Sequence, residues 1–182
     1  MNPFNIKSST FNLFFLCISF SIYANPILDF AKNKQLQYSS RIKDRKYVTI
    51  IDFSKPITDE RLYVVDIKKG SIILKCRVAH GIGSGSNYAV KFSDVEGSKM
   101  SSIGAFISTY TYYGQWGYSL KLKGLDKQNV HAEERTIVFH SEKKMKTKWS
   151  WGCFSVPDDV NRKLINLIKD GSLILATNKL PN

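Results

Sequence analysis

Short segments rich in valine, isoleucine and tyrosine, separated by glycine-containing turns, recur along most of this 182-residue chain. Branched and aromatic side chains favour extended backbone because they pack well on a pleated sheet. Strands are predicted at residues 47–53, 62–68, 72–79, 103–113, 118–123, 136–140 and 172–177. Between the second and third of these, Lys69-Gly70-Ser71 has the composition of a hairpin turn. The pattern predicts a single, mostly β domain.

The predicted strand 72–79 shows an alternation that places every second side chain on one face. That face carries the apolar residues Ile72, Leu74, Cys76 and Val78. The opposite face carries Ile73, Lys75 and Arg77. We therefore expect Cys76 to be a core side chain.

Two helices are predicted, one before the first strand and one before the last. Residues 26–36 begin with a proline and have apolar side chains at helical spacing. The second helix is indicated by Ser155 as a side-chain cap, Pro157 in the first turn and Gly171 at the stop. Its apolar stripe consists of Val160, Leu164, Leu167 and Ile168.

The N-terminus has the composition of a secretory signal. Lys7 precedes an apolar run at residues 11–23, which is short for a membrane span, and Ala24 offers a small residue at a cleavage point. We interpret residues 1–24 as a signal peptide cleaved near Ala24, with a periplasmic or secreted product that is not inserted in the membrane. A retained membrane anchor is the alternative, less favoured because no charge follows the run directly.

Charge and cysteine content exclude some classes of protein. The chain has 27 Lys plus Arg against 15 Asp plus Glu, a net charge of +12, so we expect an anionic partner such as nucleic acid, acidic lipid or another anionic polymer. Three cysteines, none in a Cys-x-x-Cys pair, argue against a structural zinc module. Outside the cytoplasm, a disulfide between Cys76 and Cys153 is an open alternative.

One segment combines a nucleophile with a base. His140 ends a predicted strand, and Cys153 follows in the tight turn Ser150-Trp151-Gly152-Cys153. A thiolate is a strong nucleophile, and a nearby imidazole can take the thiol proton. The glycine lets backbone N–H groups point at a developing oxyanion. From the residues alone, a catalytic thiol, a disulfide and an inert thiol all remain open.

The Ser-Trp-Gly-Cys turn after a strand ending in histidine resembles the catalytic motif of the L,D-transpeptidases of the YkuD superfamily, bacterial enzymes that cross-link peptidoglycan. The segments 61–66, 80–85, 97–104, 119–125 and 171–175 are also similar to the murein L,D-transpeptidase branch of that superfamily. The similarity covers most of the chain from residue 47 onward. It implies a β-sandwich or barrel catalytic domain at 47–182, preceded by a helical segment at 25–46 and including a C-terminal helix.

The resemblance also implies a mechanism. Cys153 would attack a carbonyl at an L-centre of a peptidoglycan stem peptide, usually diaminopimelate, and expel D-alanine. An amine of a second stem would then resolve the thioester. His140 would be the general base and ion-pair partner, and the backbone N–H groups of Trp151, Gly152 and Cys153 would form the oxyanion hole. Neither a metal nor an organic cofactor is implied, and the partner would be peptidoglycan rather than nucleic acid.

Some positions depart from the family pattern. His140 and Cys153 are only thirteen positions apart, so the loop between them is shorter than usual. The residues that differ from those common in the family are Ser141, Trp151, Phe154 and Ser155. Two alternatives therefore accompany the transpeptidase interpretation: an L,D-carboxypeptidase that uses water as acceptor, and a peptidoglycan-binding module of the same fold without catalysis.

Four further residues are candidates for binding substrate or supporting the pair. His80 and Gly81 open a glycine-rich loop that could line the cleft, or form a strand end and a turn. Arg135 could hold a stem carboxylate or make a surface ion pair. Ser150 could hydrogen-bond the catalytic pair or simply make the turn.

Two runs of side chains have weaker functional interpretations. The aromatic stretch could stack on sugar rings or pack the sheet, and consists of Tyr110, Tyr112, Tyr113, Trp116 and Tyr118. The lysine cluster could steer an anionic substrate or form a solvated loop, and consists of Lys143, Lys144, Lys146 and Lys148. His131 lacks the spacing of a metal-binding motif.

Overall fold

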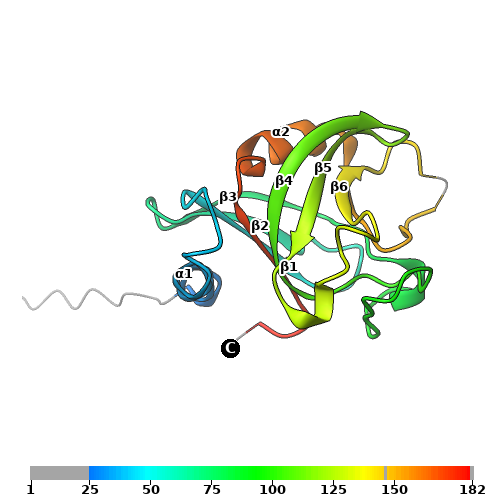
Figure 1. The fold of residues 1–182 in the computed structure, drawn as a ribbon, viewed down its shortest axis with the longest axis horizontal. Helices are drawn as coiled ribbons and strands as arrows, with labels where there is room; N and C mark the ends of the chain where they lie inside the picture. Colours follow the sequence, from blue (N-terminus) through cyan, green and yellow to red (C-terminus); the bar gives the residue numbers. More distant parts are fainter. Residues whose placement is uncertain (1–24, 146, 181–182) are drawn as a thin grey trace, which may run out of the picture.

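The computed structural model describes residues 25–145 and 147–180 (Figure 1). The predicted signal peptide and Lys146 lie outside these residues. Within them, no helix has the length and apolar character needed to cross a membrane.

Eight strands form one continuous sheet in the order β3-β2-β1-β8-β4-β5-β6-β7 (Figure 1). The strands are β1 Tyr47–Asp52, β2 Leu62–Asp66, β3 Ser71–Cys76, β4 Gly104–Gly114, β5 Gly117–Gly124, β6 Val138–Ser141, β7 Phe154–Val156 and β8 Leu173–Thr177. Neighbours pair antiparallel except β1 with β8 and β6 with β7, which are parallel. The predicted mostly β domain with a helix near each end is confirmed.

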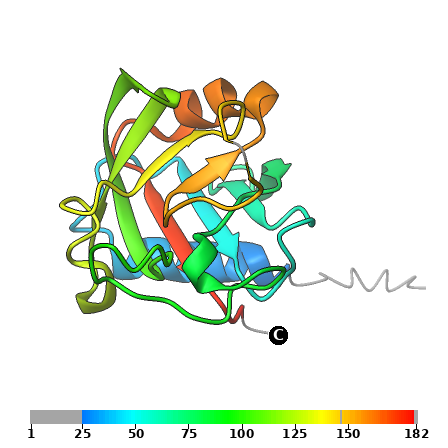
Figure 2. The ribbon, with the colours of Figure 1, turned by 90° about the vertical axis from the view of Figure 1, so that its right-hand side faces the viewer.

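The sheet is strongly curled (Figure 2), and the chain that follows one edge strand, β3, is bonded to the chain at the other edge. Beyond the end of β3, the Ala79 N–H donates to the Ser155 carbonyl at 2.8 Å, and Gly81 forms a parallel bridge with Ser150. These bonds join the chain after β3 to the chain around β7. The arrangement is therefore barrel-like, and it holds the segment before Cys153 against the loop that begins at His80.

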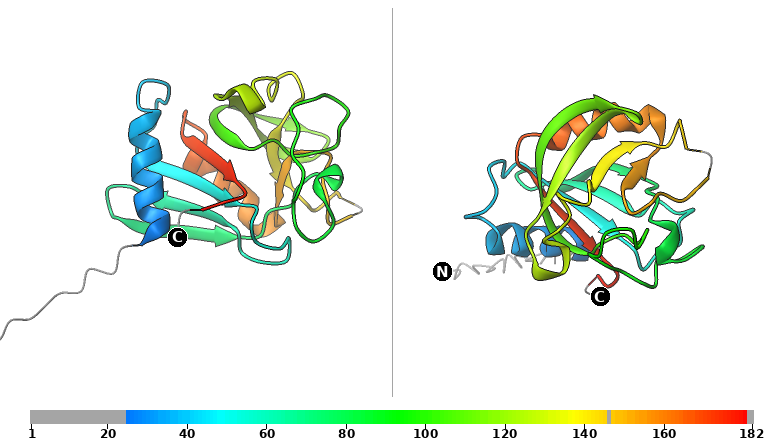
Figure 3. Two further views of the ribbon diagram at one scale, coloured as in Figure 1. Left: turned by 90° about the horizontal axis from the view of Figure 1, so that it is seen from below. Right: turned by 45° about the vertical axis from the view of Figure 1, so that its right-hand side comes forward.

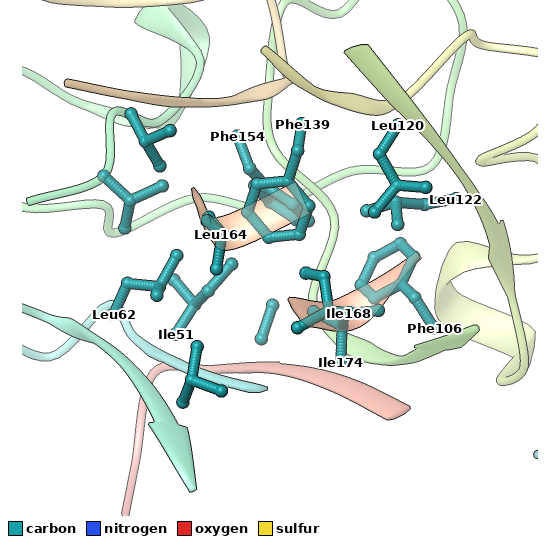
Figure 4. Close-up of a cluster of buried hydrophobic side chains, with 14 of the residues drawn as sticks. Ile51, Leu62, Phe106, Leu120, Leu122, Phe139, Phe154, Leu164, Ile168 and Ile174 are labelled. Atoms are coloured by element: carbon teal, nitrogen blue, oxygen red, sulfur yellow. The ribbon is translucent and has the colours of Figure 1, made fainter. Parts of the chain in front are cut away.

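A helix covers each face of the sheet. Helix α2, Asp158–Ile168, packs its apolar side against the inner core, where Leu164, Ile165 and Ile168 are fully buried. The inner core takes side chains from all eight strands, including Ile51, Leu62, Phe106, Leu120, Phe139, Phe154 and Ile174 (Figure 4). Each such side chain contributes about 1.5–3 kcal/mol when it leaves water.

Helix α1, Pro26–Gln37, lies across the outer face of the sheet (Figure 3). It begins where the Asn25 side chain accepts hydrogen bonds from the Ile27 and Leu28 N–H groups. Its buried Ala31 packs in a second cluster with Val48 and Leu173. The predicted helix at 26–36 is confirmed, and its packing buries one face of the central strands.

Two local expectations are wrong, and one strand lies where none is predicted. Ser155 does not cap α2, because it lies in β7 and the helix follows Pro157 without a side-chain cap. The strand β7 itself was not expected from the sequence. A β-bulge between β2 and β3 pairs Val65 with Ile72 but Val64 with Leu74. The bulge sends Ile72 to the outer cluster and Ile73 to the inner one, against the predicted alternation. Cys76 is buried, as predicted.

Candidate active site

A cavity of about 760 Å³ opens between the β4–β5 hairpin, β6 and the turn before β7. Cys153 and His140 both line it, together with Trp116, Arg135 and Trp151. The two predicted reactive groups therefore share one cavity.

Strand pairing explains why the two groups share it. In the parallel ladder of β6 and β7, Phe139 lies beside Phe154. Both phenylalanines point into the inner core. Because side chains alternate along a strand, the flanking His140 and Cys153 point to the opposite face, where the cavity lies.

The turn at residues 150–153 carries the predicted nucleophile and is called the nucleophile turn below. It is held by side-chain hydroxyls. Ser150 Oγ donates to the Cys153 carbonyl at 2.7 Å and accepts from the Gly152 N–H at 3.1 Å. Ser101 Oγ accepts from the Gly81 N–H at 3.0 Å and donates to the Gly152 carbonyl at 3.1 Å. Gly152 has φ +126°, a conformation that L side chains rarely adopt. The Ser150 side chain thus supports the turn by bonding to the backbone groups of Gly152 and Cys153.

The three predicted oxyanion-hole donors differ in whether they already donate a hydrogen bond within the protein. The Gly152 N–H is already bonded to Ser150 Oγ. In the described part of the chain, the Trp151 and Cys153 N–H groups donate to no other group. Only the Gly152 N–H is thus engaged within the turn, and the oxyanion-hole assignment stays a prediction.

His140 is almost fully buried, and its tautomer follows from its one hydrogen bond. Its Nδ1–H donates to the Ser141 carbonyl at 2.8 Å, which leaves Nε2 as the basic nitrogen. Burial lowers the pKa of His140, and the Ser141 carbonyl opposes this shift. The lowered pKa favours the neutral form of the imidazole.

Cys153 is also neutral at rest. Burial raises the pKa of its thiol, while a hydrogen bond from the Val138 backbone and the charge of Arg135 act in the opposite direction. The Sγ lies 3.5 Å from the Thr136 carbonyl, to which the thiol donates. Burial thus favours the uncharged form of both the thiol and the imidazole, and the ion-pair role of His140 stays a prediction.

Arg135 clamps a loop. Its guanidinium donates to the Ser93 carbonyl at 2.7 Å, to Ser102 Oγ at 2.6 Å and to the Met100 carbonyl at 2.8 Å. It also lies 3.7 Å from Asp94, and its side chain is only 4% exposed. The ion pair of the alternative interpretation is present, with Asp94, but the guanidinium lies inside the protein rather than on its surface. Most of its donors already have acceptors within the protein.

His80 is buried beside the cavity wall and does not line the cavity. Its Nε2–H donates to the Gly85 carbonyl at 2.9 Å, and its Nδ1 accepts from the fully buried Arg61 at 2.8 Å. Burial lowers the pKa of His80 to about 4. His80 is thus a neutral, buried side chain that links the loop at Gly85 to Arg61. Sequence reasoning missed Arg61, because a charged residue type gives no sign that it is buried.

Gly81 contributes through its lack of a side chain. A Cβ there would lie 2.8 Å from the Gly152 nitrogen and would overlap the Lys99 carbonyl. The loop can therefore approach the nucleophile turn only with glycine at this position. Gly81 is a packing position and does not line the cavity.

Aromatic and cationic side chains surround the cavity. Trp116 stacks on His140 with ring centroids 5.3 Å apart and planes 24° apart. Trp151 is 76% exposed, and Lys99 Nζ lies 5.6 Å from its ring centroid. Of the aromatic stretch, Tyr112 and Trp116 line the cavity, and of the lysine cluster Lys144 does. The stacking on the base was not foreseen.

The remaining cysteine and histidine were also candidates for other chemistry. Cys76 and Cys153 are both free thiols, so the disulfide alternative is wrong. His131 Nδ1 lies 2.9 Å from Asp94. Among residues 25–145 and 147–180, no three His, Cys, Asp or Glu side chains gather as a metal site would require.

Comparison with known proteins gives a family. A family model described as "L,D-transpeptidase catalytic domain" matches residues 18–177. No curated protein matches the chain.

Among solved structures, the helical cell shape determining protein Pgp2 from Campylobacter jejuni aligns with a TM-score of 0.51 at 12% identity, over 85% of this chain and 55% of that one. An L,D-transpeptidase from Stackebrandtia nassauensis aligns with a TM-score of 0.47 at 14% identity, over 85% and 68%. L,D-transpeptidase 1 from Mycobacterium tuberculosis aligns with a TM-score of 0.44 at 11% identity, over 72% and 61%. This chain thus spans about six tenths of the length of that relative. Since the family model covers residues 18–177, most of this 182-residue chain, the chain belongs to the L,D-transpeptidase catalytic domain family.

Proposed function

We propose that this chain is an exported cysteine L,D-transpeptidase that acts on peptidoglycan stem peptides through a thioester acyl-enzyme. The observation that carries the proposal is the placement of the Cys153 thiol and the His140 imidazole on one cavity of about 760 Å³. Family membership supports the same reaction class. The proposal takes residues 1–24 as the export signal and 47–182 as the catalytic domain.

In the first half of the reaction, His140 Nε2 takes the proton of the Cys153 thiol as the sulfur attacks the carbonyl carbon of the donor stem. The Trp151 and Cys153 N–H groups would stabilise the oxyanion. When the tetrahedral intermediate collapses, the C–N bond to D-alanine breaks. The leaving amine takes the proton from the imidazolium, and a thioester remains on Cys153.

In the second half, an amine of an acceptor stem attacks the thioester carbonyl, and His140 takes a proton from that amine. The C–S bond then breaks, a new amide bond forms, and the sulfur regains a proton from the imidazolium. The complete cycle returns the pair to its neutral resting form. That form agrees with the pKa directions of both groups, because burial favours the uncharged state of each.

The charge of the site suits an anionic substrate. The cavity lining holds three cationic side chains, Lys99, Lys144 and Arg135, and one carboxylate, Glu96. Stem peptides carry free carboxylates, so the cationic wall would favour their approach. The net charge of the whole chain, +12, acts in the same direction.

The test is product analysis with a purified disaccharide-tetrapeptide donor whose side-chain amine is blocked, so that it cannot serve as its own acceptor, with and without an added amine acceptor. We expect a cross-linked or exchanged product only when acceptor is present, and none from Cys153→Ala. The matched control is Cys76→Ala, which removes the other described cysteine and is expected to leave the products unchanged. Release of D-alanine without acceptor incorporation would make the protein a carboxypeptidase, and no turnover of any donor would overturn the enzyme proposal.

Export has a separate test. Cell fractions are compared for the full chain and for a chain lacking residues 2–24. We expect the full chain outside the cytoplasm with a new N-terminus at Asn25, and the shortened chain inside. A full-length protein that keeps Met1 in the membrane fraction would contradict the signal-peptide assignment.

A further inference from the structure

One side chain contacts the proposed base from outside the catalytic motif. Trp116 lies in the turn between β4 and β5, flanked by Gly114 and Gly117, of which Gly117 has φ +85°. The hairpin carries the half-buried indole onto His140, where the two rings lie nearly parallel with centroids 5.3 Å apart. One face of the imidazole is therefore covered by the face of an indole.

The proposed reaction needs a positive charge on this buried ring. The Nδ1–H partner is the neutral Ser141 carbonyl, and no carboxylate among the described residues hydrogen-bonds His140. The nearest acidic side chain in that network, Asp158, accepts instead from Ser141 Oγ at 2.7 Å and pairs with Lys143 at 3.3 Å. The imidazolium thus lacks the carboxylate partner that commonly stabilises a catalytic histidine.

The charged groups that line the same cavity do not replace that carboxylate. The cationic side chains of the lining, Arg135, Lys144 and Lys99, offer no negative charge to an imidazolium. Glu96 is the one carboxylate of the lining, and the burial of His140 rather than any carboxylate dominates its pKa. The Cys153 thiolate, formed in the same step, is the other negative charge on this cavity.

The face of the Trp116 indole can supply the negative charge density that these groups do not. An aromatic ring carries negative charge density on its face, and tryptophan attracts a cation there more strongly than tyrosine or phenylalanine. We propose that Trp116 is a positioning residue that holds the His140 imidazole in place and stabilises the imidazolium formed when the Cys153 proton is transferred. This inference rests on the proposed function, and it assigns a role to the β4–β5 hairpin in that reaction.

The test measures thiol reactivity and needs no peptidoglycan. In a Cys76→Ala background, the rate of Cys153 alkylation by iodoacetamide is followed from about pH 5 to about pH 10, a range that spans the ordinary histidine and thiol pKa values. Trp116→Leu keeps an apolar cover but removes the aromatic face, and Trp116→Phe keeps a weaker one. Tyr113→Ala is the matched control, because Tyr113 lies on the same hairpin and packs against Tyr118 with tilted rings whose centroids are 5.2 Å apart, outside the cavity lining.

We expect Trp116→Leu to slow alkylation near neutral pH about five-fold, which corresponds to ~1 kcal/mol. Trp116→Phe is expected to recover about half of that loss in energy, and Tyr113→Ala to match the parent. NMR titration of His140 is expected to give a lower imidazole pKa in Trp116→Leu. A role in excluding water alone predicts the opposite direction, because added water stabilises the charged ring.

An unchanged rate in Trp116→Leu, an equal loss in Tyr113→Ala, or a raised His140 pKa would overturn the inference. So would an alkylation rate that does not depend on His140, measured with His140→Ala. The proposed function is tested separately by product analysis. A Trp116-dependent thiol that forms no cross-link would refute the transpeptidase and leave the role of Trp116 standing.

Discussion

Replacing Arg135 with methionine distinguishes a loop clamp from a substrate-binding guanidinium. In the structure, Arg135 makes three hydrogen bonds of 2.6–2.8 Å to Ser93, Met100 and Ser102, with Asp94 at 3.7 Å. Methionine keeps most of the apolar stem but has no donor. The buried acceptors of the loop would then lose their partners.

The expected cost follows from those contacts. Each hydrogen bond contributes a net of about 1 kcal/mol, and leaving Asp94 without its partner adds about 1 kcal/mol more. Arg135→Met should therefore lower the free energy of unfolding by about 3–4 kcal/mol. For a domain of this size that corresponds to a fall in Tm of about 10 °C. It is a large part of the ~5–15 kcal/mol that stabilises a typical domain.

The assay is urea and thermal denaturation of Arg135→Met, Arg135→Lys and the control Arg77→Met. Arg77 pairs with Glu142 at 3.1 Å on the surface, where such a pair contributes about 0–1 kcal/mol. We expect Arg135→Lys to fall between the parent and Arg135→Met. If Arg135→Met kept the stability of the parent but lost only activity, the clamp would be wrong and a substrate contact right.

Three further predictions follow from buried positions. Gly81→Ala should slow Cys153 alkylation and lower Tm, because its Cβ would displace the nucleophile turn; wild-type values for both would contradict the close approach. The His80 pKa of about 4 lies below its ordinary value of 6.5. Between about pH 6.5 and about pH 4, the unfolded chain therefore binds a proton at His80 that the folded chain does not. The free energy of unfolding should thus fall by up to about 3 kcal/mol as the pH drops through that range. Denaturation of the parent and His80→Gln across that range checks this: the variant should lose part of the slope, and an unchanged slope would refute it. Burial raises the pKa of Cys76 to about 12, so mass spectrometry of the folded protein at neutral pH should find alkylation on Cys153 alone; modification of Cys76 at a similar rate would refute its burial.

Much of the sheet could be predicted because its strands are long enough to show an alternating or continuous apolar pattern. β7 could not, because Phe154–Val156 is too short to show a period. The position of Ile72 was wrong for a related reason. A bulge inserts one extra residue into the pairing of two strands, and this changes the face to which the following side chains point. The alternation within one strand does not show where its pairing with the neighbouring strand is interrupted.

The candidate pair followed from a local motif, whereas its surroundings depend on contacts between distant segments. Arg135 is buried because the loop at 93–102 turns its carbonyl groups toward it. Trp116 meets His140 because a hairpin turn sets where its side chain lies. A charged or aromatic residue type does not specify either contact, so both required the tertiary structure.

The most direct test of the account is the intact mass of the protein after incubation with a carbapenem, an acylating mimic of the stem peptide, followed by peptide mapping. We expect one adduct per chain, located on Cys153, absent from Cys153→Ala and formed about a hundredfold more slowly in His140→Ala. No adduct, an adduct on Cys76, or equal rates with and without His140 would contradict the proposal that Cys153 and His140 act as nucleophile and base.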